Sequence, residues 1–141
     1  MAMKMTHPKT LPGLRDALVF ISLLFLFASA PAAHAHARML KSIPAKDAEL
    51  TVAPAQLELW FNELLEDGFN TIEVYPYAEL DAPKHGNLAQ GKAAVDAKDR
   101  THLTVKLGAL APGKYVVDWR VLSRDGHFAP GRITFVIKDS K

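Results

Sequence analysis

A carboxylate and an imidazole that could share a metal ion lie two residues apart near the end of the chain, at Asp125 and His127. Gly126 between them allows a sharp backbone bend, so that an oxygen and a ring nitrogen could converge on one ion. An ordinary Asp-Gly surface turn that binds nothing explains the same three residues. The spacing alone therefore leaves both interpretations open.

A further candidate ligand is His36, whose chemistry depends on where the mature chain begins. A histidine in first position offers its amine and its ring Nδ1 to the same ion. Added to Asp125 and His127, these atoms make a set of nitrogen and oxygen donors that suits Cu(II) better than zinc or calcium. The chain contains no cysteine, which excludes thiolate metal sites, a disulfide scaffold and a thiol nucleophile.

The first 35 residues have the pattern of a secretory signal peptide. Three basic residues precede an apolar run over residues 17–28, and small residues follow it. This run is too short for a membrane anchor, which needs about 20 apolar residues. Cleavage after Ala35 would make His36 the first residue, whereas cleavage after Ala32 would place Ala33 there. The pattern alone permits both.

Residues 36–141 form a neutral chain with the length of one domain. Without the first 35 residues, 14 basic and 14 acidic side chains remain, which argues against nucleic acid as the partner because phosphate binding needs a basic surface. We expect one exported domain. Because it lacks disulfides, its fold must depend on a hydrophobic core.

Alternation of apolar and polar residues predicts β-strands throughout this domain. The alternating runs cover residues 56–61, 71–75, 101–107, 114–121 and 131–137, with a shorter first strand near 38–42. Turn residues separate the runs, and no long amphipathic helix is expected. The polar segment 78–100 is expected to be a long loop with one short strand. Short strands with regular turn signals predict an all-β, Ig-like sandwich of two sheets.

Six short motifs occur together along the mature chain. They are Leu40-Lys-Ser-Ile-Pro-Ala45, Leu59-Trp-Phe-Asn-Glu63, Leu110-Ala-Pro-Gly-Lys-Tyr115, Asp118-Trp-Arg-Val121, Ser123-Arg-Asp-Gly-His127 and Gly131-Arg-Ile-Thr-Phe135. With the Ala33-His34-Ala35 that precedes His36, this combination resembles the CopC family of periplasmic copper-binding and copper resistance proteins. The resemblance covers nearly the whole mature chain.

The resemblance implies a Greek-key β-sandwich or barrel, here of about seven strands, and it favours cleavage after Ala35. It implies that His36 binds Cu(II) through its amine and imidazole, with Asp125 and His127 as the other ligands. Glu63 matches an acidic family position and is a weaker candidate, in contact with the metal or in its second shell.

One family feature is missing from this sequence. Some members bind Cu(I) with a methionine-rich loop, but residues 77–100 contain no methionine. We therefore expect one Cu(II) ion per chain. The family also implies an inner-membrane copper transporter of the CopD type as a partner, with import, resistance and storage all open as roles.

Two other functions are compatible with these residues. An N-terminal histidine and a second histidine also resemble the histidine brace of copper monooxygenases, although the short chain shows no obvious flat aromatic face for a polysaccharide. The second alternative is a metal-free Ig-like interaction module. We expect a copper-binding protein for sequestration, transfer or resistance, and not an enzyme.

Overall fold

The structure is a computed structural model of the chain, and it describes residue 13 and residues 37–139. The chain divides into two units, Met1–His34 and Ala35–Lys141, and the second unit contains the strands. The expected signal peptide, apart from Gly13, and His36 lie outside the described residues. No helix in the described part of the chain is long and apolar enough to cross a membrane.

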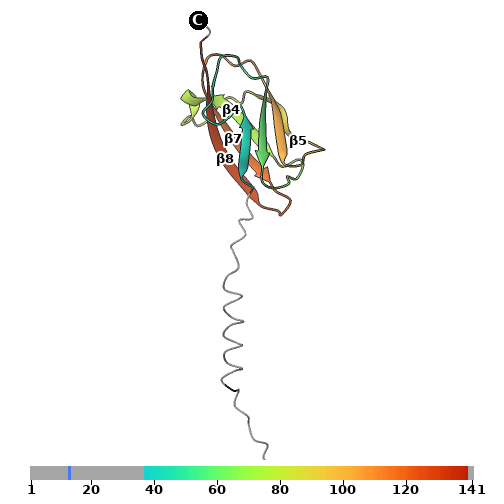
Figure 1. Cartoon of the computed structure of the whole chain (residues 1–141). Helices are drawn as coiled ribbons and strands as arrows, with labels where there is room; N and C mark the ends of the chain where they lie inside the picture. Colours follow the sequence, from blue (N-terminus) through green and yellow to red (C-terminus); the bar gives the residue numbers. More distant parts are fainter. Residues whose placement is uncertain (1–12, 14–36, 140–141) are drawn as a thin grey trace, which may run out of the picture. The chain divides into compact units, whose positions relative to one another are not determined.

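Ala35–Lys141 contains two four-stranded sheets (Figure 1). The first has the order β1-β3-β6-β5 and the second the order β2-β8-β7-β4. Within the second sheet β2 runs parallel to β8, whereas the other neighbours in both sheets are antiparallel. The strands are β1 (Met39–Ile43), β2 (Glu49–Leu50), β3 (Gln56–Phe61), β4 (Thr71–Pro76), β5 (Ala89–Val95), β6 (His102–Leu107), β7 (Gly113–Leu122) and β8 (Phe128–Ile137).

Each sheet buries the apolar face that the alternation predicts. In β3, Leu57, Leu59 and Phe61 are at most 1% exposed, and the inward residues of β4, β6, β7 and β8 are buried in the same way. Phe61 of the first sheet meets Trp119 of the second edge to face, with ring centroids 6.3 Å apart. Because burying apolar surface is the main favourable term in folding, this shared core can hold the domain without disulfides.

The indole of Trp119 packs directly over the backbone of the neighbouring strand. Trp119 and Gly131 are cross-strand partners of β7 and β8. A Cβ atom at Gly131 would lie 2.2 Å from Trp119 Cζ2, far inside van der Waals contact. Glycine at this position therefore makes room for the large ring that closes the core.

The outward face of the second sheet carries a smaller buried patch. Tyr75 of β4 and Val116 of β7 are cross-strand partners that are at most 1% exposed, yet they lie outside the central core cluster. The segment after β4 covers them. It contains the 3-10 turn η1 (Tyr77–Glu79) and His85, whose ring stacks on Tyr75 at 3.8 Å between centroids. The end of this segment is held to β4 by a hydrogen bond from Leu88 N to Val74 O over 2.7 Å.

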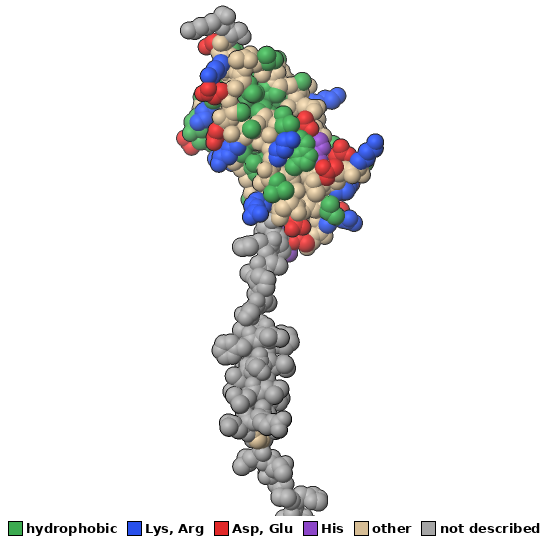
Figure 2. Space-filling view, viewed as in Figure 1, with side chains coloured by type: hydrophobic (Ala, Val, Ile, Leu, Met, Phe, Trp, Pro, Cys, Tyr) green, Lys and Arg blue, Asp and Glu red, His purple; other side chains and the backbone are tan. Residues whose placement is uncertain are grey.

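The domain surface mixes charges of both signs. Figure 2 shows Lys and Arg side chains interspersed with Asp and Glu over the visible face of the domain. Exposed ion pairs such as Arg100–Asp67, at 2.7 Å, contribute little stability each. They do keep the visible face from presenting one continuous basic surface. The absence of a nucleic-acid partner stays a prediction.

The all-β sandwich is confirmed, with two differences in detail. The segment expected as a loop with a short strand holds β5, which is seven residues long. Its sequence, Ala-Gln-Gly-Lys-Ala-Ala-Val, has one β-branched residue, and its pairing with β6 shifts register between Gln90 and Ala94, so the alternation is broken. The two-residue β2 is too short to alternate at all. The described residues thus form eight strands where about seven were expected.

Candidate metal centre

The turn between β7 and β8 brings Asp125 and His127 together. Cross-strand pairing ends at Leu122 and Phe128, and residues 123–127 close the hairpin. Ser123 N donates to His127 O over 3.1 Å, and Gly126 N donates to Ser123 O over 2.9 Å. Gly126 has φ +88°, a conformation that glycine adopts without steric cost. Gly126 therefore allows the expected backbone bend between the two candidate ligands.

The two side chains lie within contact distance of each other. His127 Nδ1 is 3.2 Å from Asp125 Oδ2, and the His127 backbone N–H donates to Asp125 Oδ1 over 3.1 Å. The His127 side chain is 58% exposed and that of Asp125 32% exposed, so both can be reached from solvent. The arrangement offers one oxygen and one nitrogen at the surface of a fixed turn.

Asp125 is held as a carboxylate by its neighbours. The Ser123 hydroxyl, which donates to Asp125 Oδ1, is the main reason that the pKa of Asp125 lies below the ordinary aspartate value. The His127 backbone N–H and then the His127 ring lower it further. Hydrogen bonds to the charged form favour that form, so Asp125 stays ionised and available to a cation at neutral pH.

The segment 62–66 connects this turn to the start of the described domain. On one side Asn62 N donates to Arg38 O over 3.0 Å, while Arg38 N donates to Asn62 Oδ1. On the other side, Leu64, two residues after Asn62, accepts a hydrogen bond from Arg124 N over 2.9 Å. The residues that immediately follow His36 in the sequence and the Asp125–His127 turn therefore lie at one end of the sandwich (Figure 1).

Glu63 lies within this connecting segment and is half-buried. Its Oε1 atom is 3.4 Å from Asn62 Nδ2. Across residues 37–139, no three His, Asp or Glu side chains are grouped so that they could hold a metal ion. The structure therefore does not make Glu63 a third member of the Asp125–His127 pair, and His36 lies outside the described residues.

Two further histidines lie on the outward faces of the sheets. His102 of β6 lies on the outward face of its sheet beside its cross-strand partner Trp60, and the two rings stack with centroids 4.3 Å apart. Its Nε2 atom is 2.9 Å from Glu58 Oε2, and only 14% of the side chain is exposed. His85 stacks on Tyr75. Among the described residues, neither histidine belongs to a group of three side chains that could hold a metal ion.

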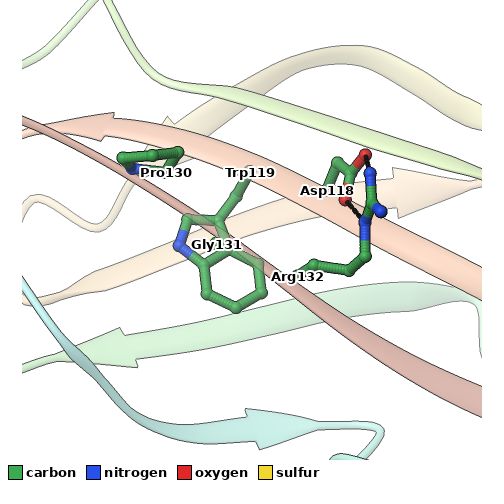
Figure 3. A pocket seen from close by; sticks show the side chains of 5 residues that line it. All are labelled: Asp118, Trp119, Pro130, Gly131 and Arg132. Atoms are coloured by element: carbon green, nitrogen blue, oxygen red, sulfur yellow. Dashed lines mark hydrogen bonds and ion pairs between the residues drawn. The ribbon is translucent and has the colours of Figure 1, made fainter.

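A shallow cavity of about 400 Å³ opens elsewhere on the β7–β8 pair (Figure 3). Its lining residues are Asp118, Trp119, Pro130, Gly131 and Arg132. Figure 3 shows the Arg132 guanidinium facing the Asp118 carboxylate. Arg132 Nη2 donates to Asp118 Oδ2 over 2.7 Å, and the Tyr75 hydroxyl donates to the same oxygen over 2.7 Å. These charges satisfy each other, and the cavity contains none of the predicted metal ligands.

Comparison with known proteins decides the family. The model of the CopC domain matches residues 39–138. The chain belongs to the CopC family. A solved structure, that of CopC from Methylosinus trichosporium OB3b, aligns with a TM-score of 0.65 at 26% identity, covering 75% of this chain and 97% of that one. The sandwich and the resemblance to CopC proteins are thereby confirmed.

Several relatives of this chain have names that refer to copper. The copper transport protein CutJ of Bacillus subtilis (strain 168) is 39% identical over 119 residues, which cover 83% of this chain and 21% of CutJ. Copper resistance protein C of Pseudomonas syringae pv. tomato is 34% identical over 107 residues, which cover 75% of this chain and 83% of that protein.

Two residues of the candidate site were not singled out from the sequence. Ser123 holds Asp125 and the turn, and Asn62 ties the connecting segment to Arg38. The signal for Ser123 is its position two residues before an aspartate in a turn, a spacing at which short polar side chains hydrogen-bond locally. Asn62 gives no comparable signal, because its partner lies 24 residues away.

Proposed function

We propose that this CopC-family protein is exported to the periplasm and there binds one Cu(II) ion at the β7–β8 turn. His36, as the first residue of the exported chain, supplies its amine and a ring nitrogen. Asp125 and His127 supply an oxygen and a further nitrogen. Four nitrogen and oxygen donors suit the tetragonal preference of Cu(II). The protein sequesters the ion or hands it to a partner.

The observation that carries this proposal is the 3.2 Å separation of Asp125 Oδ2 and His127 Nδ1. Two ligand atoms each about 2.0 Å from an ion, at an angle of roughly 90–110°, lie about 2.8–3.3 Å apart. The pair, which lies at ion-pair distance in the structure, therefore also has a spacing compatible with two adjacent ligands of one ion. The described His, Asp and Glu side chains form no group of three that could hold a metal ion, so the proposal takes the remaining donors from His36.

The position of Ala37 and Arg38 supports His36 as the source of those donors. Ala37 is 8% exposed and belongs to the core cluster, and Arg38 is paired in both directions with Asn62. The chain is therefore anchored from the residue directly after His36. Leu64 of the same segment accepts a hydrogen bond from the Arg124 backbone N–H. One segment therefore contacts both the residues that follow His36 and the turn that carries Asp125 and His127.

Glu63 has a secondary role in this proposal. It lies between Asn62, which fixes Arg38, and Leu64, which fixes Arg124. A half-buried carboxylate at that place adds negative charge beside a cation site. We assign it to the surroundings of the ion, where it contacts a ligand or the His36 amine.

A role in transfer is supported by exposure and by one relative. The His127 side chain is 58% exposed, so a partner can reach an ion bound there. In CutJ, named as a copper transport protein, the part that matches this chain is 21% of the length. A CopC-like domain within a longer transport protein supports a separate inner-membrane transporter, of the CopD type, as the partner of this chain.

The test is a Cu(II) competition titration of the exported protein against a chelator of known affinity. We expect one ion per chain and tight binding that is lost in His36→Ala and His127→Ala. His85→Ala serves as the matched control, because His85 stacks on Tyr75 away from the turn, and it should bind as the wild type does. Binding that survives in both His36→Ala and His127→Ala would refute the site, whereas wild-type protein that binds no Cu(II) would favour the metal-free interaction module.

The monooxygenase alternative is tested separately. The copper-loaded protein is incubated with cellulose or chitin and a reductant, and soluble oxidised sugars are measured. We expect none above the level of the His36→Ala variant, because a carboxylate ligand from Asp125 occupies a position that an oxidant would need. Copper-dependent chain cleavage by the wild type would overturn the binding role.

A further inference from the structure

The hydroxyl of Ser123 is buried beneath the candidate copper site. Ser123 follows β7 directly, and its side chain is 0% exposed. Its backbone is fixed on two sides, since Ser123 N donates to His127 O over 3.1 Å and Ser123 pairs with Leu65 in an isolated β-bridge. The backbone position from which the Ser123 side chain extends is therefore fixed, and the contacts of the hydroxyl are set by the folded turn.

This hydroxyl donates its hydrogen to Asp125 Oδ1. Its oxygen also lies 3.2 Å from His127 O, but a hydroxyl has one hydrogen to give. The ionised carboxylate is the stronger acceptor of the two.

The two oxygens of Asp125 consequently differ in what they can do. Oδ1 accepts from the Ser123 hydroxyl and, over 3.1 Å, from the His127 backbone N–H, which occupies both of its lone pairs. Oδ2 lies 3.2 Å from His127 Nδ1, on the side of the second ligand. An ion that took both oxygens would have to break two hydrogen bonds, one of them to a buried donor.

We infer that Ser123 is a positioning residue that makes Asp125 a one-oxygen ligand through Oδ2. This inference rests on the proposed function, because it specifies how the same site holds its ion. A carboxylate fixed in this way fills one coordination position instead of two. The other positions then remain for the three nitrogen donors, which keeps the ion four-coordinate.

The first test compares Ser123→Ala with the wild type by Cu(II) competition titration and electron paramagnetic resonance. Loss of an outer-sphere partner typically weakens metal binding by about 10–100-fold, and we expect a loss of that size with altered copper hyperfine splitting. Ser42→Ala is the matched control. Ser42 is 5% exposed and its hydroxyl has no hydrogen-bond partner among the described residues, so this variant should match the wild type. Unchanged affinity and an unchanged spectrum in Ser123→Ala would overturn the inference.

A second readout needs no variant and so does not depend on how Ser123→Ala folds. Infrared difference spectra of wild-type protein with labelled aspartate carboxylates compare the copper-free and Cu(II)-bound forms. We expect the wide splitting of carboxylate stretches that marks one-oxygen ligation. The narrow splitting of a two-oxygen chelate would refute the role of Ser123 while leaving copper binding intact. Failure of the proposed function itself is recognised differently, as wild-type protein that binds no Cu(II).

Discussion

Asp125 Oδ2 and His127 Nδ1 lie 3.2 Å apart on a turn of five residues. The spacing is produced by Gly126, by the closing hydrogen bond between Ser123 and His127, and by the buried Ser123 hydroxyl. Two donor atoms are thus oriented by the fold before an ion arrives. Preorganisation of this kind reduces the ordering cost of binding, which suits the proposed copper-binding role.

The amine of the first residue can be tested without touching any side chain. Adding one alanine before His36 keeps the imidazole but moves the amine one residue away, which destroys the chelate. We expect Cu(II) affinity to fall by more than the roughly 100-fold that an outer-sphere change can cause, measured by competition titration. One alanine added after Lys141 is the control. Equal affinity in the two extended proteins would exclude the amine as a ligand.

Acid should weaken copper binding through the nitrogen ligands and not through Asp125. The pKa of Asp125 is lowered by the Ser123 hydroxyl and the His127 N–H, so its carboxylate is still ionised where histidines begin to gain protons. With a reference histidine pKa of about 6.5, protons compete with the ion increasingly below about pH 6. Titrations from pH 8 to pH 5 measure this loss. A constant affinity over that range would count against histidine ligation.

Gly131→Ala tests the packing that closes the core. Its new Cβ would meet Trp119 Cζ2 at 2.2 Å, so the indole or the strand must move. Overpacking of this kind costs about 1–3 kcal/mol in the free energy of unfolding, which urea denaturation measures. Gly86→Ala is the matched control, because nothing lies within 4 Å of its added Cβ. Equal midpoints for the two variants would show that the indole is not confined.

The Asp118–Arg132 pair predicts part of the acid sensitivity of the fold. Arg132, and to a smaller extent the Tyr75 hydroxyl, hold the pKa of Asp118 below its ordinary value. A carboxylate with a lowered pKa in the folded state stabilises the protein above its unfolded pKa of about 3.9 and loses that contribution as the pH falls. The stability gap between wild type and Asp118→Asn should therefore shrink from pH 7 to pH 3. A gap that stays constant would show that Asp118 titrates alike in both states.

Most of the fold follows from the sequence because its strands are half-buried. In β3, each inward residue is apolar and each outward residue is polar or amphipathic, so period-two alternation reports the face directly. The rule fails where burial has another cause. Tyr75 and Val116 are buried on the outward face by the segment around His85. Because that cover comes from outside the two strands, it leaves no periodic signal in their sequences.

The candidate site is divided in the same way between local and distant contacts. Asp125 and His127 are two residues apart, so the turn chemistry of the intervening glycine is readable in the sequence. The hydrogen bonds that bring Arg38 and Arg124 to one segment, through Asn62 and Leu64, join residues far apart in the chain. Such tertiary pairings depend on the assembled sandwich and are visible only in the structure.

In the proposed function, cleavage after Ala35 creates the copper site by making His36 the first residue. Native mass spectrometry of the protein exported by living cells, recorded with and without Cu(II), reports the first residue and the stoichiometry together. We predict a chain that begins at His36 and gains the mass of one copper ion. A chain that begins at Ala33, one that retains residues 1–35, or one that gains no copper would contradict the account.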